Sequence, residues 1–225
     1  MRLSVVILLC LSLPFFAYSQ EEESKSGIGF FVYGGLQMPQ LNEMNAFFEN
    51  SGYSKLPDNY FSGGFAVFKE TGKIFNTVEM YGYNGQKSMS GNTVSLNVIG
   101  SSISFGYSFS FSEDENLKII PSIALNAYRV SLKTSISSTS PVSYPSYLGN
   151  GNMEEINNDG IGGAFNLMLL ASPFKKWTSF NLGVRTGYNY TIESSWKTLN
   201  SQNVTDVPDA EFLGLSASLV LGLRF

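Results

Sequence analysis

The sequence contains no histidine, and its single cysteine is Cys10, close to the N-terminus. Histidine is the commonest general base in enzymes and the commonest protein ligand of transition metals, so its absence argues against both kinds of site. A serine nucleophile would have no evident base to activate it. We therefore expect no catalytic residue, no metal site and no cofactor, and the protein is not expected to be an enzyme.

Basic charge and long apolar runs are also scarce. The chain has 14 Lys and Arg residues against 18 Asp and Glu residues, which gives a formal net charge of −4. Because no basic patch is present, nucleic acid is not an expected partner. After the first 19 residues, no apolar run approaches the length of about 20 residues that a transmembrane helix needs.

Residues 1–19 have the features of a secretory signal peptide. Arg2 gives a weakly basic start, residues 5–16 are apolar, and a small-x-small cleavage site ends at Ser19. Cys10 lies inside this segment, so the mature chain has no disulfide. Cleavage near Ser19 would leave residues 20–25 as a short acidic lead-in, and residues 26–225 are predicted to form one domain.

The last sixteen residues, 210–225, alternate between two kinds of side chain. One parity is apolar and ends with Leu219, Leu221, Leu223 and Phe225, whereas the other is mostly small or polar. Alternation with period two predicts a β-strand with two different faces. A strand with one apolar face and a terminal aromatic residue is typical of a closed barrel in lipid.

The rest of the chain predicts seven further strands. The expected ranges are 26–37, 60–69, 74–83, 93–112, 117–133, 159–172 and 178–193, followed by the strand at 210–225. Long and short connections alternate, as they do in small outer-membrane barrels with short periplasmic turns and longer extracellular loops. In 93–112 the apolar parity reverses near Gly100, which predicts a bulge or a strand end that leaves the membrane.

Aromatic residues are predicted to gather at the two membrane interfaces. The expected sets are Phe109, Phe111, Trp177 and Phe225 at the lower interface, and Tyr60, Tyr81, Tyr188 and Tyr190 at the upper one. In the first long connection, residues 40–51 predict a short amphipathic helix whose apolar face is Leu41, Met44, Phe47 and Phe48. This face either packs on the barrel rim or forms a lid or an element that contacts a ligand or a partner.

Several segments resemble a known family. They are G-I-G-F-F-V-Y-G-G in the first strand, I-I-P-S-I-A-L-N-A-Y in the fifth, L-N-E-M-N-A-F-F-E-N-S-G-Y in the first loop, and L-V-L-G-L-R-F at the end. They are similar to small outer-membrane β-barrels of the OmpA/OmpW-like superfamily, in particular the Bacteroidota outer-membrane β-barrel domain group. The resemblance implies an all-β fold, an eight-stranded antiparallel transmembrane β-barrel with a short helix in its first extracellular loop.

The resemblance also implies a location and partners. The protein would be exported through the periplasm to the bacterial outer membrane and would be embedded in its lipid. The final strand, with Leu219, Leu221, Leu223 and Phe225, resembles the signal that the barrel-assembly machinery recognises. The extracellular loops could contact a protein partner.

Charged and amide residues on the inward parity predict a polar network in the lumen. The candidates are Glu79, Asn126, Arg185, Asn189 and Arg224. Because buried charges need partners, we expect an ion pair between Glu79 and Arg185, bridged by water or by asparagine side chains. The network could be structural and close the barrel, or it could form a polar path or gate.

Three functional classes follow from these patterns. The first is a structural or interaction role in the outer membrane, such as surface contact, adhesion or service as an accessory subunit of a membrane complex. The second is a narrow channel or transporter for a small or apolar molecule. The third is a soluble, lipocalin-like barrel, which would place its apolar face inside and its polar face outside.

Overall fold

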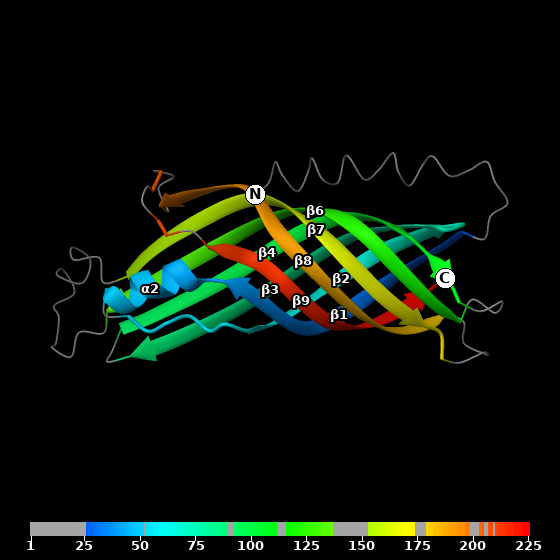
Figure 1. Ribbon diagram of the computed structural model, residues 1–225, viewed down its shortest axis with the longest axis horizontal. Coiled ribbons are helices and arrows are strands. Elements are labelled where there is room, and N and C mark those ends of the chain that lie inside the picture. The colour runs from blue at the N-terminus through cyan, green and yellow to red at the C-terminus, as the bar shows by residue number, and fades with distance from the viewer. Residues whose placement is uncertain are drawn as a thin grey trace.

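The chain forms a closed antiparallel β-barrel, with one short helix among the residues that the structure describes (Figure 1). The computed structural model describes residues 26–51, 53–89, 92–111, 116–136, 153–173, 179–198, 203–204, 207–208 and 210–225. These residues form β1 (Ser26–Gln40), α2 (Asn42–Asn50), β2 (Tyr60–Thr71), β3 (Ile74–Met89), β4 (Asn92–Tyr107), β5 (Phe109–Ser110), β6 (Leu117–Ile136), β7 (Met153–Ala171), β8 (Phe180–Thr198) and β9 (Glu211–Arg224). The predicted signal peptide, the acidic lead-in and Trp177 lie outside the described residues.

The nine described strands correspond to eight strands of the barrel wall, which we call staves. The number is eight because β4 and β5 are two parts of one predicted strand. Both pair with β6, and the register continues unchanged from Gly106 opposite Ser122 to Phe109 opposite Ile119. In that register Pro121 lies opposite Tyr107, and a proline has no N–H to donate to the ladder. Neighbouring staves pair in order, and β1 pairs with β9 to close the barrel. The predicted eight-stranded architecture is confirmed.

The strands extend further than predicted at one end. β3 continues to Met89, so residues 84–89 are strand and not loop, β7 begins at Met153 and β8 continues to Thr198. These extensions carry polar residues on their outward face, including Asn84, Gln86 and Asn157. The apolar alternation that identifies a lipid-facing strand is therefore lost there, although the backbone pairing continues.

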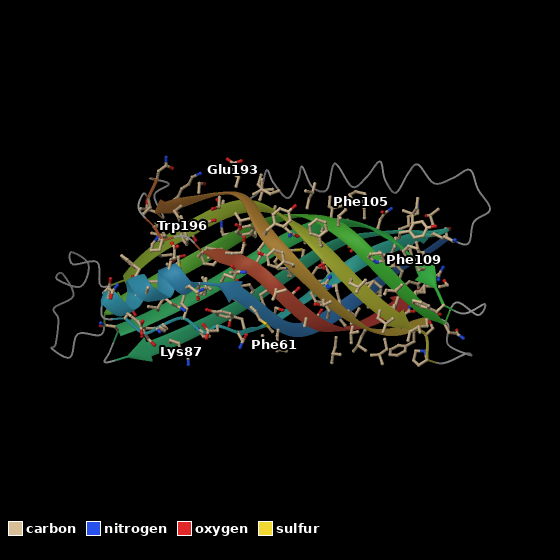
Figure 2. The ribbon with its side chains drawn as sticks, viewed as in Figure 1. Phe61, Lys87, Phe105, Phe109, Glu193 and Trp196 are labelled. Carbon is tan, nitrogen blue, oxygen red and sulfur yellow. The ribbon has the colours of Figure 1, made fainter. Side chains whose placement is uncertain are left out.

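The outward face of the barrel is a band of exposed apolar side chains, as expected of a transmembrane barrel. Phe61, Phe105 and Phe109 project away from the ribbon in Figure 2, and Phe61 is 75% exposed. Leu219, Leu221, Leu223 and Phe225 also face outward. This arrangement is the reverse of the one that a lipocalin-like barrel requires. Among the described residues, no helix has the length and hydropathy needed to cross a bilayer.

Two tyrosines that we predicted at the upper interface lie inside the barrel. Tyr60 is only 3% exposed, and the hydroxyl of Tyr81 is buried. Both residues have the inward parity of their strands, next to the outward Phe61 and Met80, so strand alternation decides their orientation and their aromatic character does not. Tyr188 and Tyr190 do face outward.

The interior contains two apolar clusters. We call the end of the barrel that carries α2 the helix end, and the opposite end, where Ser26 and Phe225 lie, the terminus end (Figure 1). The helix-end core comprises Leu41, Met44, Phe48, Leu56, Tyr60, Tyr83, Val94, Leu96, Val98, Tyr128, Val130, Leu132, Phe212 and Leu213. The terminus-end core comprises Phe31, Ala66, Phe68, Phe75, Ile120, Met168, Leu170 and Val220.

The helix-end core explains the parity reversal in the fourth predicted strand. Of our two expectations, the bulge was wrong. The other, a strand end that leaves the membrane, stays a prediction. β4 pairs without interruption with β3 and β6 across Gly100. Val94, Leu96 and Val98 have the same inward parity as Ser102 and are fully buried. The strand keeps its orientation. What changes, from Ser102 towards Val94, is that the inward side chains turn from polar to apolar.

Irregular pairing occurs elsewhere. The β7–β8 register shifts between Ile161 and Gly162, and the β1–β9 register shifts between Met38 and Gln40. At the second site Gly214 has φ of +39°, a left-handed conformation that favours glycine, and an added Cβ would collide with the Met38 carbonyl oxygen. Because of this irregularity, the Leu213 side chain points into the helix-end core, although strict alternation predicts that it faces lipid.

Candidate functional site

The helix α2 closes the helix end of the barrel as a plug. Leu41, Met44 and Phe48 lie along one stripe of the helix surface and are buried in the helix-end core. Phe47 was predicted on the same apolar face, but it is 50% exposed, whereas Phe48 is 3% exposed. The contact stripe is narrower than the predicted face, since residues one position apart on a helix point in different directions.

A buried asparagine attaches the following segment to the helix. Asn45 donates to the carbonyl oxygen of Leu56 at 3.2 Å, and its side-chain oxygen accepts from the Leu56 N–H at 2.8 Å. Leu56 is itself buried in the helix-end core. Asn45 was not among the predicted site residues, because a polar side chain next to Met44 gives no local signal that its partner is a backbone eleven residues further on.

Aromatic side chains fill the barrel below the plug. Tyr60 and Tyr83 are in contact with their ring centroids 5.0 Å apart, and Trp196 meets Phe212 edge to face at 5.7 Å. The Tyr83 hydroxyl donates to the carbonyl oxygen of Phe212. This bond connects β3 to β9 across the interior and holds the irregular segment that precedes Gly214.

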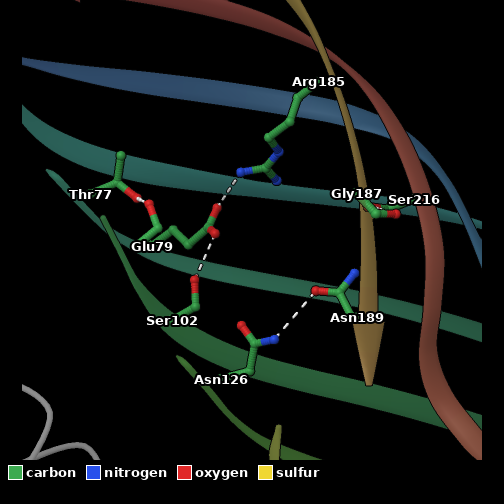
Figure 3. Close-up of polar contacts among 9 residues, drawn as sticks. Thr77, Glu79, Ser102, Asn126, Arg185, Gly187, Asn189 and Ser216 are labelled. Carbon is green, nitrogen blue, oxygen red and sulfur yellow. Dashed lines mark hydrogen bonds and ion pairs between the residues drawn. The ribbon is translucent and has the colours of Figure 1, made fainter. Parts of the chain in front are cut away.

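Below the aromatic layer lies a polar layer, shown in Figure 3, which we call the polar belt. Arg185 in β8 forms an ion pair with Glu79 in β3, with 2.6 Å between Nη1 and Oε2. The Ser102 hydroxyl donates to the other carboxylate oxygen of Glu79 at 2.6 Å. The Arg185 guanidinium also lies 4.1 Å from the centre of the Tyr33 ring, within the range of a cation–π contact. The structure thus brings together the two charges that we expected to pair, but the contact is direct, and the expected bridge of water or asparagine side chains was wrong.

The polar belt continues with amides and hydroxyls. Asn126 donates to Asn189 at 3.3 Å, and Asn189 donates to the carbonyl oxygen of Gly214 at 3.2 Å. Thr77 and Ser104 share a hydrogen bond of 2.6 Å. Four of the five predicted lumen residues therefore lie in this layer.

Arg224, the fifth predicted lumen residue, belongs to a separate cluster, so a single network is wrong. It pairs with Glu70 at 3.0 Å, and the other oxygen of Glu70 accepts from Lys118 at 2.7 Å. This ion triad closes the terminus end. On β2, Phe68 separates Glu70 from Ala66, the cross-strand partner of Glu79, and Phe75 lies directly opposite Glu70. The inward parity of Glu70 was visible in the sequence, but its cross-barrel partners depend on how the staves are staggered.

Little space remains inside the barrel. A cavity of about 20 Å³ lies between the polar belt and the terminus-end core, next to Arg185, Asn166 and Ser122. This volume is close to that needed for one water molecule. The polar belt and the two cores thus fill the described interior.

Between β8 and β9, a side chain takes over from the backbone hydrogen bonds of the ladder near the helix end. The β8–β9 ladder ends with Tyr188 opposite Leu215. Beyond that pair, the Glu211 carboxylate accepts from the Thr191 N–H at 2.6 Å, from the Thr191 hydroxyl at 2.9 Å and from the Leu213 N–H at 3.2 Å. Glu211 therefore satisfies backbone donors that the irregular β9 segment leaves without ladder partners.

The buried acidic residues inside the barrel are paired with cations and are not grouped as metal ligands among the described residues. No group of three or more Cys, Asp or Glu residues that could hold a metal ion occurs within the part of the chain that the structure describes. The buried carboxylates of Glu79 and Glu70 are both paired with cations. Paired in this way, neither carboxylate is an uncompensated buried charge.

Solved structures with the same architecture are known. The chain is similar to a major outer membrane protein from Thermus thermophilus, with a TM-score of 0.53, 9% identity, and coverage of 88% of this chain and 99% of that chain. It is also similar to Neisserial surface protein A (TM-score 0.46, 14% identity, 88% and 94% coverage) and to Ail, the attachment invasion locus protein of Yersinia pestis (TM-score 0.46, 13% identity, 91% and 100% coverage).

No protein-family model and no curated protein sequence matches the chain. The similarity to the Thermus structure, at 9% identity, concerns the fold. The fold is that of a small outer-membrane β-barrel.

Proposed function

We propose that this protein is an integral barrel of the bacterial outer membrane, closed to solutes, with a structural or surface-contact role and no catalysis. The observation that carries the proposal is the filled interior: the helix-end core, the polar belt and the terminus-end core follow one another between the two ends. An eight-stranded barrel is just wide enough for its own side chains to fill, so no pore is expected.

The outward surface supports the proposed location. Its apolar band gives way to polar residues at the helix end, where Arg129 pairs with Asp159 and Lys133 pairs with Glu155. On β6 the outward residues below Arg129 are apolar, including Ile123 and Leu125. The helix end would therefore project from the bilayer as a plugged head on the extracellular side and offer the surface for a protein partner.

Two finer assignments belong to the same proposal. Export would follow cleavage of a signal peptide near Ser19, and insertion would use the final strand that ends in Phe225. The motifs in the first, fifth and last strands favour the Bacteroidota outer-membrane β-barrel group.

Conductance across a planar bilayer tests the closed state. We expect the wild-type protein to give no current above background, with an open porin as the positive control. The variant Met44→Ser/Phe48→Ser loosens the plug but leaves the polar belt and the terminus-end core in place, so it should also be silent. Steady current through the wild type would refute the proposal.

A gated channel is the second candidate function. It is favoured by the fact that the plug, α2, is not part of the barrel wall. Met44 and Phe48 enter the helix-end core from a segment that is not part of the barrel wall. Current through the loosened variant alone would support this candidate. Folding and location are checked separately by outer-membrane fractionation and by the mobility shift between unheated and boiled samples.

A further inference from the structure

We propose that a groove on the lipid-facing wall of the barrel holds one acyl chain of a membrane phospholipid in a fixed position. The groove crosses β4, β6, β7 and β8 and reaches β9. The inference requires that the barrel lies in a bilayer, and it does not depend on whether the lumen conducts. It goes beyond the proposed function because it assigns a ligand site on the outer wall.

Two rows of outward side chains form the walls of the groove. The first wall is Phe105, Ile123, Phe165, Tyr188 and Leu215, each of which is the cross-strand neighbour of the next. The second wall lies two residues closer to the terminus end on each strand and contains Tyr107, Pro121, Leu167 and Thr186.

The floor of the groove is formed between these walls by residues with small or inward-pointing side chains. Gly106 and Gly187 have no side chain, and Ser122 and Asn166 belong to the inward parity of their strands. Pro121 and Thr186 are short compared with the aromatic residues of the first wall. The depression has a volume of about 680 Å³.

The chemistry of the groove fits hydrocarbon. Ile123, Phe165 and Leu167 expose between 44% and 60% of their surface. The Thr186 hydroxyl already donates to the carbonyl oxygen of Ser216 at 3.0 Å, so it does not need a polar ligand. Because the groove is continuous with the lipid-facing band, the solvent that reaches it is the acyl region of the bilayer.

The dimensions of the groove also fit one chain. Four strand intervals of roughly 4.8 Å give a length of about 19 Å, measured across the strands. Strands in such barrels tilt by about 40°, so this path rises by about 12 Å along the membrane normal. One leaflet has a hydrocarbon thickness of about 15 Å, which is a similar length. The path runs from Phe105, near the terminus end of β4, to Leu215, near the helix-end start of β9.

Native mass spectrometry of barrels reconstituted in dimyristoylphosphatidylcholine vesicles and then transferred to a mild detergent tests the site. We expect the wild type to retain one phospholipid per barrel. Thr186→Phe fills the groove and should lose the lipid, whereas Thr186→Val removes only the hydroxyl and should keep it. Ala127→Phe adds the same ring to the outward face of β6 outside the groove and should also keep the lipid.

Three results would overturn the proposal. They are a wild-type barrel that retains no lipid, a Thr186→Phe variant that retains as much as the wild type, and a wild-type dimer in which a second copy occupies the groove. The unheated and boiled gel mobility shows whether each variant folds. If Thr186→Phe fails to fold, Thr186→Leu takes its place with the same expected loss.

Discussion

The two ends of the barrel interior are both filled with apolar side chains, but they are closed by different parts of the chain. At the terminus end, the rings of Phe31, Phe68 and Phe75 stack with centroid distances of 4.3 and 5.1 Å between neighbours, and all three come from wall strands. At the helix end, Met44 and Phe48 come from α2, which is not part of the wall.

This difference predicts two kinds of stability. The terminus end cannot open unless staves separate, because its core and its wall are the same strands. The helix end can open when α2 and the Leu56 segment detach, which leaves the ladder intact. Local openings of this kind have lower free energies than global unfolding. Substitutions in the polar belt and at the two ends should therefore differ both in the stability they cost and in where the barrel opens.

The substitution Glu79→Ala should have the largest effect, because the polar belt lies between the two cores and supports both. It leaves the guanidinium of Arg185 buried without its carboxylate partner, which costs about 3–5 kcal/mol of the free energy of unfolding. Urea unfolding in phospholipid vesicles measures this loss. The double variant Glu79→Ala/Arg185→Ala should recover part of it, and an unchanged stability in Glu79→Ala would show that the pair is not buried as described.

The substitution Glu70→Ala tests the terminus end. It removes the Glu70 carboxylate that pairs with both Lys118 and Arg224, but the Arg224 side chain is 27% exposed, so water relieves part of the cost. We expect a loss of about 3 kcal/mol in the free energy of unfolding. Since Arg224 lies in the strand that closes the barrel, the loss should appear as easier global unfolding, with no separate transition at the helix end.

How far the sequence predicts these features depends on their range along the chain. The lipid-facing parity of Leu219, Leu221 and Leu223 is local, so period-two alternation is enough to predict it. The reversal near Gly100 was also visible, but periodicity alone does not distinguish a bulge from a change in what fills the lumen.

Cross-barrel partners were harder to predict. Glu79 and Arg185 were paired correctly in the sequence analysis because they are complementary charges on inward parities. Arg224 was assigned to the wrong cluster because the height of a residue in the barrel depends on the stagger of all the staves. The partner of Asn45 was invisible for a similar reason, since it is a backbone in an irregular segment.

At the helix end, Phe48→Ala tests whether the plug can detach by itself. The substitution removes a ring that is buried against the helix-end core, which costs about 3 kcal/mol. Hydrogen exchange should become faster in α2 and around Leu56, whereas the amides of the terminus-end staves keep their protection. Phe47→Ala is the matched control, since this neighbouring ring is half exposed and should change stability by less than about 1 kcal/mol.

The substitution Asn45→Ala should have the smallest effect and the most local one. It removes both hydrogen bonds to the backbone of Leu56, so a buried N–H and a buried carbonyl lose their partner. Such a loss costs about 1–2 kcal/mol when the groups stay buried. If the Leu56 segment instead detaches, water satisfies these groups, and hydrogen exchange at residues 53–56 accelerates while the urea midpoint stays nearly constant. This second pattern is the one that an independently opening helix end predicts, and equal protection of both ends in Asn45→Ala would contradict it.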